Sequence, residues 1–170
     1  MSQSYLRNLI LFSLCLAMAL LPHCSTRGKE SSAAPGFSLK TLEDQEIALT
    51  SLKWKVVLLD FWATWCGPCR EAIPHLASLQ KKYQEKGLIV IGMNVDKGER
   101  DVVRRFVKSM EIPYPILLTP EEVVRSYGVS ALPTSVLIDK EGNIREKITG
   151  FNSSIAKKLS ERVGELTSEK

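Results

Sequence analysis

The chain is organised around the segment Val56-Val57-Leu58-Leu59-Asp60-Phe61-Trp62-Ala63-Thr64-Trp65-Cys66-Gly67-Pro68-Cys69. Its first half is a short apolar run, rich in β-branched and aromatic residues, which predicts a buried strand. Beyond the cysteines, apolar residues recur at helical spacing, at Ile73, Leu76, Ala77 and Tyr83. The cysteine pair therefore stands where a strand passes into a helix. This places the first sulfur over the backbone N–H groups at the start of the helix, which lack partners, and the helix dipole there favours a thiolate. The pattern therefore indicates a dithiol that exchanges disulfides.

The bulk composition is that of an ordinary globular protein. The chain has 170 residues, of which 44% are hydrophobic and 25% charged, which suits one domain with additional segments. The net charge of +4 is spread among acidic residues, and no basic cluster alternates with aromatic residues. We therefore expect a solvated surface and no nucleic-acid partner.

The remaining cysteines and the histidines limit the other roles for the pair. Cys15 and Cys24 lie near the N-terminus, and no cysteine follows Cys69, so a framework of several disulfides is excluded for the folded part. A zinc site would need two further ligands, but the chain has only His23 and His75. An inert disulfide closing so short a loop would stabilise little. We expect neither a metal nor another cofactor.

The first 24 residues predict a leader segment. Arg7 precedes the apolar run 9–21, which is shorter than the about 20 residues of a membrane span and suits a signal peptide. Leu21-Pro22-His23-Cys24 resembles a bacterial lipobox, whose cysteine is lipidated and becomes the mature N-terminus. Lipoboxes usually carry small residues where Pro22 and His23 stand.

Two alternatives to lipidation remain open. Ala17-Met18-Ala19 could be a signal-peptidase site that releases a soluble protein, or the segment could stay as a short anchor. All three outcomes place the domain outside the cytoplasm. Residues 25–35, rich in Ser, Thr, Gly, Lys, Glu and Ala, predict a flexible tether, and the domain is expected over 36–170.

Within the domain, strand and helix patterns alternate. Short strands at 37–39 and 47–49 predict a hairpin, and the central strand is followed by a helix over 67–86 that Pro74 should kink. The further expected elements are a strand at 88–95, a helix at 102–110, a strand at 116–118, a helix at 121–127, a hairpin of 135–138 with 144–148, and a final helix around 155–166. This order predicts an α/β fold with a central mixed sheet.

A family resemblance rests on Phe61-Trp62-Ala63-Thr64-Trp65-Cys66-Gly67-Pro68-Cys69 together with Leu132-Pro133-Thr134. These motifs resemble the thioredoxin superfamily, and more narrowly its extracytoplasmic TlpA/ResA-like thiol–disulfide oxidoreductases. The resemblance covers about residues 35–166. The N-terminal hairpin and the inserted helix–strand–helix over 99–127 point to the subgroup. The resemblance implies a thioredoxin-like fold, with a mixed sheet flanked by helices.

The resemblance also implies roles for the motif. Cys66 would be the accessible nucleophile that forms a mixed disulfide with substrate, and Cys69 would then attack Cys66 and release the reduced substrate. Gly67 would permit close approach, and Pro68 would occupy the first helical turn, where its missing N–H costs nothing. Trp65 would offer apolar surface to the substrate, with ordinary packing as the alternative.

Asp60 interrupts an otherwise apolar strand. An isolated buried carboxylate is unfavourable, so the group should be neutral, hydrated or partnered. It stands six residues before Cys66, where thioredoxins carry a buried aspartate that accepts the proton of the second cysteine. The resemblance implies that role here. The alternative is a partly exposed acid at the end of the strand.

Two further positions bear on the subgroup and on substrate binding. ResA-like proteins commonly carry a glutamate three residues after the second cysteine, but Ala72 stands there, and Glu71 lies about 100° away around the helix. The sequence thus combines a ResA-like frame with a thioredoxin-like acid. The resemblance implies that the Leu132–Pro133 bond is cis and leaves a backbone edge open for an extended peptide. A trans proline at a strand start is the alternative.

Taken together, these features predict a membrane-tethered, extracytoplasmic reductase of protein disulfides. The reducing direction rests on Gly67-Pro68, the dipeptide of reducing thioredoxins. A reductant outside the cytoplasm needs electrons, so the resemblance implies a membrane dithiol donor of the CcdA or DsbD type. Apocytochrome c or other oxidised secreted proteins would be the substrates.

Two other classes of function remain as alternatives. A thiol peroxidase usually carries Pro-x-x-x-Thr-x-x-Cys, whereas Ala63-Thr64-Trp65 precede the first cysteine here without such a proline. A non-catalytic binding module would use the groove beside Pro133 as a chaperone surface.

Overall fold

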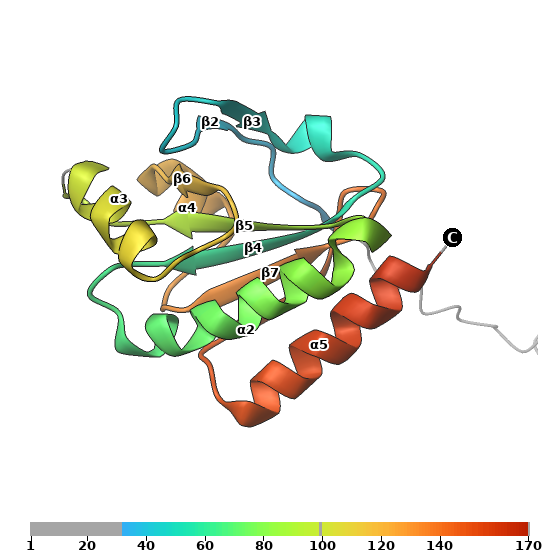
Figure 1. Ribbon diagram of the computed structural model, residues 1–170. Coiled ribbons are helices and arrows are strands. Elements are labelled where there is room, and N and C mark those ends of the chain that lie inside the picture. Colours follow the sequence, from blue (N-terminus) through green and yellow to red (C-terminus); the bar gives the residue numbers. More distant parts are fainter. Residues whose placement is uncertain (1–31, 99, 170) are drawn as a thin grey trace, which may run out of the picture. The chain divides into compact units, whose positions relative to one another are not determined.

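The computed structural model describes residues 32–98 and 100–169. The predicted leader, with Cys24, lies outside the described residues. The elements are β1 (Ser32–Ala33), β2 (Ser38–Lys40), β3 (Glu46–Ala48), η2 (Leu49–Leu52), β4 (Val56–Trp62), α2 (Gly67–Tyr83), η3 (Gln84–Lys86), β5 (Leu88–Asn94), α3 (Arg100–Ser109), β6 (Ile116–Leu118), α4 (Glu121–Ser126), β7 (Thr134–Ile138), β8 (Asn143–Thr149) and α5 (Ser153–Ser168) (Figure 1).

A mixed six-stranded sheet forms the centre of the domain. Its strand order is β1-β8-β7-β4-β5-β6. β4, β5 and β6 run parallel, whereas β7 is antiparallel to β4 and β8 is antiparallel to β7. β2 and β3 form a separate antiparallel pair, the predicted N-terminal hairpin. The predicted α/β fold with a mixed sheet, and the helix–strand–helix before the final hairpin, are confirmed.

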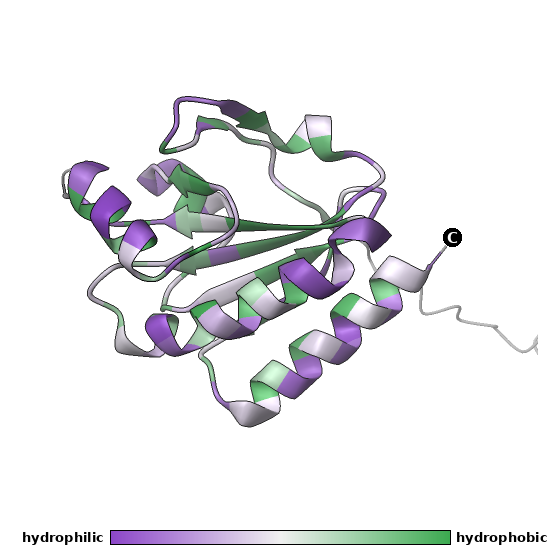
Figure 2. Cartoon of the chain, in the orientation of Figure 1, coloured by the Kyte–Doolittle hydropathy of each residue, from purple (hydrophilic) through white to green (hydrophobic). Residues whose placement is uncertain are grey.

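Every residue of β4 is buried, because layers cover both faces of the sheet. On one face Leu58 and Trp62 belong to a core that includes residues of α2 and α5, two helices that lie side by side across the strands (Figure 1). On the other face Val57, Leu59 and Phe61 pack in a second core. Figure 2 shows the hydrophobic residues concentrated in the strands and the hydrophilic ones on the outer sides of the helices.

α2 begins directly at the cysteine pair. Cys66 is its N-cap, and the Cys66 sulfur accepts a hydrogen bond from the backbone N–H of Cys69. Pro68 lies in the first turn, where a helix loses nothing from a missing N–H. The helix continues through Pro74 to Tyr83, and η3 and Gly87, at φ 88°, then end it. The predicted span 67–86 agrees with α2 and η3 together.

The predicted tether extends too far at its C-terminal end. Ser32 and Ala33 form β1, which pairs with β8, and the Ala34 N–H donates to the Gly142 carbonyl at 2.9 Å. Composition misled here, because an edge strand is held by backbone hydrogen bonds that small polar residues form as well as apolar ones. Over the described ranges, no helix has both the length and the apolar character needed to cross a bilayer.

Gly92 on β5 is closely surrounded by side chains, and a methyl group there should destabilise the domain. A Cβ at Gly92 would overlap Ile116 Cδ1 and lie 2.9 Å from Trp62 Nε1, and both neighbours are buried. We expect Gly92→Ala to lower the free energy of unfolding by about 1–3 kcal/mol, the usual cost of overpacking. Urea denaturation of the oxidised protein measures this change.

Gly36→Ala is the matched control for this prediction. No atom lies within 4 Å of a Cβ added at Gly36, so its free energy of unfolding should stay within about 0.5 kcal/mol of wild type. Equal unfolding curves for the two variants would show that the space beside Gly92 is not restricted.

Candidate active site

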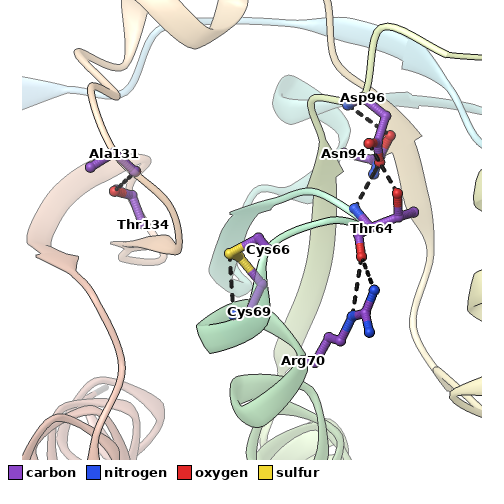
Figure 3. Close-up of a disulfide and its surroundings, with 8 residues drawn as sticks. All are labelled: Thr64, Cys66, Cys69, Arg70, Asn94, Asp96, Ala131 and Thr134. Atoms are coloured by element: carbon purple, nitrogen blue, oxygen red, sulfur yellow. Dashed lines mark hydrogen bonds between the residues drawn. A yellow bond between two sulfur atoms is a disulfide. The ribbon is translucent and has the colours of Figure 1, made fainter.

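The two cysteines of the motif are joined in the structure. The Cys66–Cys69 disulfide has an S–S distance of 2.02 Å and a Cα–Cα distance of 5.3 Å, and it lies where β4 passes through a short loop into α2 (Figure 3). Cys66 keeps 6% of its surface exposed, whereas Cys69 is fully buried at 0%. A partner molecule can therefore reach the pair only from the Cys66 side.

A hydrogen-bond network around Asp96 holds the loop that leads to Cys66. The Asp96 carboxylate accepts from the Thr64 N–H at 2.9 Å, from the Thr64 hydroxyl at 3.1 Å and from the Asn94 amide at 2.7 Å (Figure 3). Arg70, in the first turns of α2, donates from Nε and a terminal nitrogen to the Thr64 carbonyl at 3.1 and 2.7 Å. Thr64 is thereby tied to the end of β5 and to α2, which restricts where Cys66 can stand.

Sequence reasoning missed this network, although a signal for it exists. Asn94 is the last residue of β5 and Asp96 follows shortly after, so both are polar residues at the end of an apolar strand. β4 and β5 are parallel, and the carboxyl ends of parallel strands meet at the same edge of the sheet. That rule would have brought Asp96 close to the cysteine loop.

Trp65 is exposed, so ordinary packing, the alternative reading of its role, is wrong. It keeps 69% of its surface exposed. It borders a surface hollow of about 580 Å³ that also reaches Leu132, from the loop before β7. The other residues lining this hollow are Val95, Asp96, Lys97, Thr119, Pro120, Glu121 and Val124. The structure thus brings Trp65 and Leu132, two predicted substrate contacts, to one surface.

The loop before β7 carries the predicted proline geometry. The Leu132–Pro133 bond is cis, as expected from the resemblance, and the trans alternative is wrong. Pro133 itself is buried and Leu132 is half-buried. The Thr134 hydroxyl donates to the Ala131 carbonyl at 2.8 Å, and the Pro133 carbonyl accepts from the Gly150 N–H at 2.8 Å. These bonds hold the turn that presents Leu132.

Asp60 is fully buried at 0% exposure, so the alternative of a partly exposed acid is wrong. Side chains alternate along a strand, so Asp60 shares the face of Leu58 and Trp62, which pack in the same core as Cys69. Ser135 on β7 is the residue paired with Asp60 in the sheet. In the described part of the chain, however, neither carboxylate oxygen has a hydrogen-bond partner of good geometry. The carboxyl group is therefore buried on the α2 side without a partner.

Burial controls the protonation of Asp60. Desolvation raises the pKa of Asp60 from 3.8 to about 7, and it outweighs the opposite effect of the Ser135 hydroxyl. Burial likewise raises the pKa of Tyr114 well above its usual range, and the charge of Asp60 adds to that rise. The group is thus neutral in acid and titrates near pH 7, where it can exchange a proton.

The position where ResA-like proteins carry a glutamate holds no acid here. Ala72 is buried against the core at 2% exposure, and Glu71, next to it in α2, is exposed. The structure therefore leaves Asp60 as the one buried carboxyl group among those that sequence reasoning placed at the site.

Comparisons with known proteins agree with this geometry. Residues 31–147 match the model of the AhpC/TSA family. Over 151 residues, 85% of this chain and 86% of the relative, the chain is 38% identical to the thiol-disulfide oxidoreductase ResA of Bacillus thuringiensis subsp. konkukian. It is 36% identical over 149 residues to ResA of Bacillus subtilis, covering 84% of this chain and 82% of that protein.

The fold also matches solved structures. One is a thiol:disulfide interchange protein of the thioredoxin family from Chlorobium tepidum, which superposes with a TM-score of 0.73 at 30% identity. The match covers 82% of this chain and 98% of that one. The cysteine pair, the cis-proline loop and the sheet topology therefore occur together in a fold shared with disulfide-exchanging proteins.

The raised pKa of Asp60 should make the stability of the disulfide form depend on pH. Below pH 3.8 the carboxyl group is protonated in both states, and between about 4 and 7 only the unfolded chain loses the proton. The free energy of unfolding is therefore not reduced by Asp60 below about pH 4. It falls as the pH rises from there to about 7, by a total of about 4 kcal/mol. Asp60→Asn removes the dependence.

Urea denaturation of the oxidised wild type and Asp60→Asn between pH 4 and pH 8 measures this effect. The variant should gain stability relative to wild type as the pH rises, and the gain should level off above pH 7. Parallel pH profiles for the two proteins would mean that Asp60 titrates in the folded protein as it does in water.

Proposed function

This chain belongs to the AhpC/TSA family and is a thiol–disulfide oxidoreductase with a thioredoxin-like fold, and from this premise we propose that it reduces protein disulfides outside the cytoplasm. The observation that carries the proposal is the Cys66–Cys69 disulfide at the start of α2, of which only Cys66 keeps exposed surface. That asymmetry separates the roles of the two sulfurs.

The reaction transfers two electrons from the protein to its substrate. The Cys66 thiolate, stabilised at the N-terminus of α2, attacks one sulfur of the substrate disulfide and expels the other as a thiolate, which takes up a proton. Cys69 then loses its proton and attacks Cys66 Sγ, which breaks the mixed disulfide and releases the second substrate thiol. The protein ends with the Cys66–Cys69 disulfide and the substrate with two thiols.

Asp60 is the group that we assign to the proton of Cys69. Cys69 is fully buried, so its thiol proton needs an acceptor inside the core. Asp60 lies on the core face that Cys69 packs against, and its pKa of about 7 suits proton transfer near neutral pH. Asp60 would accept this proton during the second step and release it afterwards.

Substrate would lie across the hollow between Trp65 and Leu132. The exposed indole offers apolar contact area, and the half-buried Leu132 with Pro133 offers a backbone edge next to it. Arg70 and Asp96 would keep the Cys66 loop in place while a peptide binds. In this proposal Cys66 would be the nucleophile, Cys69 the resolving thiol and Asp60 the proton acceptor, and Trp65 with Leu132 would form the peptide surface.

The reducing direction and the location extend the proposal beyond the chemistry. Gly67-Pro68 is the dipeptide of reducing thioredoxins, and the leader 1–24 would export the domain, with lipidation at Cys24 and residues 25–31 as the tether. Electrons would come from a membrane dithiol protein of the CcdA or DsbD type. Apocytochrome c, whose haem-site cysteines must be reduced, and other oxidised secreted proteins are the substrates that we assign.

Replacing the resolving cysteine should trap the partners of the reaction. In Cys69→Ser the mixed disulfide on Cys66 cannot be resolved, so substrate and donor stay covalently bound. Non-reducing electrophoresis and mass spectrometry of the trapped species should identify a membrane dithiol protein and secreted proteins with cysteine pairs. The trapped bands should disappear on reduction.

Cys66→Ser is the matched control, and it should trap nothing because Cys69 is buried. Capture of only an oxidising, quinone-linked partner would reverse the proposed direction. Peroxide consumption that persists in Cys69→Ser would support a thiol peroxidase instead, and full function in Cys66→Ser would support a non-catalytic binding module.

Asp60→Asn should slow the second step more than the first. The amide cannot accept the proton of Cys69, and loss of a positioned base typically costs about 10²-fold or more. Stopped-flow measurement of the release of a fluorescent thiol from the mixed disulfide separates the two steps. The wild-type rate of release should rise through pH 7, and the variant should lack this inflection; identical profiles would exclude Asp60 as the acceptor.

A further inference from the structure

A second exposed tryptophan lies far from the cysteine pair. Trp54 keeps 76% of its surface exposed, more than Trp65, and it is flanked by the exposed residues Lys53 and Lys55. It precedes β4 at the N-terminal end of that strand, whereas Cys66 follows the C-terminal end. The two exposed tryptophans therefore lie at opposite ends of the domain.

The backbone at Trp54 is in a conformation that its side chain disfavours. Its φ of 68° lies in the left-handed region, which glycine adopts freely and bulky residues rarely adopt. The Trp54 N–H donates to the Lys140 carbonyl at 3.1 Å, and this backbone bond would form equally well with glycine. An exposed indole on a disfavoured backbone conformation adds nothing to the stability of the domain, which points to a contact with another molecule.

The described chain begins next to Trp54. In the turn between β7 and β8, the Lys140 carbonyl accepts from the Trp54 N–H and the Gly142 carbonyl accepts from the Ala34 N–H, so the first strand and the tryptophan lie against the same turn. Residues 25–31, which connect this end to the leader, can span at most about 25 Å. A lipid surface that holds Cys24 would therefore lie within reach of this end of the domain.

The chemistry of this end suits anionic lipid. Tryptophan is enriched at the membrane–water interface, and lysine is attracted to anionic headgroups. Lys86, next to Gly87, is also exposed, but its ammonium lies 5.7 Å from the centre of the Tyr83 ring. Beside Lys53, a hollow of about 160 Å³ is lined in part by the half-buried Leu49 and Leu52, which adds apolar surface. Asp139 and Glu141 line its other side, so the basic part of this end is confined to Lys53 and Lys55.

We propose that Trp54, Lys53 and Lys55 form a docking surface for an anionic lipid membrane. Docking turns Cys66 away from the membrane, toward secreted substrates. A single indole and a few lysines bind weakly, so the domain leaves the surface readily and Cys66 can then meet a donor in the membrane. This inference rests on the extracytoplasmic attachment in the proposed function.

Quenching of tryptophan fluorescence by lipid tests the proposal. The full chain is reconstituted in vesicles of phosphatidylglycerol and phosphatidylcholine with brominated acyl chains, which quench an indole only on contact. Trp62 is buried and serves as a silent reference. Wild type should be quenched, Trp54→Gly should lose the quenching, and the matched control Trp65→Phe should keep it. Equal quenching of wild type and Trp54→Gly would overturn the proposal.

Further variants keep the test sharp. Lys53→Gln/Lys55→Gln should lose quenching on anionic vesicles, and added salt should weaken it in wild type. Glycine and asparagine both tolerate positive φ, so Trp54→Gly and Trp54→Asn should fold and should give the same loss. Self-association that depends on Trp54, without quenching in wild type, would overturn the proposal in favour of a second copy of the chain.

Two parallel measurements separate this inference from the proposed function. Vesicle flotation reports attachment by the leader and should be equal for wild type and Trp54→Gly. Reduction of insulin disulfides in solution reports the chemistry and should also be equal. Loss of flotation in both proteins would refute the attachment by the leader. Absence of insulin reduction would refute the reductase. The docking surface itself is tested by the quenching measurement.

Discussion

Burial of β4 on both faces is the constraint on which the rest of the structure depends. Its seven residues are all buried between two apolar layers, so the strand cannot shift its register without moving an entire face into the wrong layer. The chain must therefore leave the sheet at one place, directly after Trp62. The cysteine loop and α2 follow there, so the packing of β4 in the core fixes the position of the reactive sulfurs.

Asp60 shows how the same burial changes the protonation of a carboxyl group. A carboxyl group at the middle of a buried strand destabilises the fold once it ionises, and here neither oxygen has a partner among the described residues. The cost is tolerable because the group is neutral below about pH 7. The property that makes Asp60 a poor core residue, a pKa close to neutral, makes it a suitable proton acceptor for a buried thiol.

Much of the fold and part of the site could be predicted because the signals are local. Apolar runs of strand length, helical spacing after Cys69 and the hairpin turn at 139–143 each depend on neighbouring residues. The prediction was wrong for the end of the tether, since β1 is held by backbone bonds to β8 that no side chain reveals. It missed the Asp96–Thr64 contact, which joins residues 32 positions apart and follows only from the parallel pairing of β4 with β5.

The amino-acid order was sufficient for the class of fold and the dithiol chemistry, because each is carried by a short local pattern. It also drew attention to Asp60, which interrupts an apolar strand, whereas the cis bond at Pro133 was expected only from the family resemblance. Exposure and long-range contact depended on the packed chain. Trp54 and Trp65 both sit beside buried strands in the sequence, and Trp62 sits between them, yet only Trp62 is buried. Which indole meets solvent is decided by the direction of the backbone and by the layers above it, and neither is encoded in spacing.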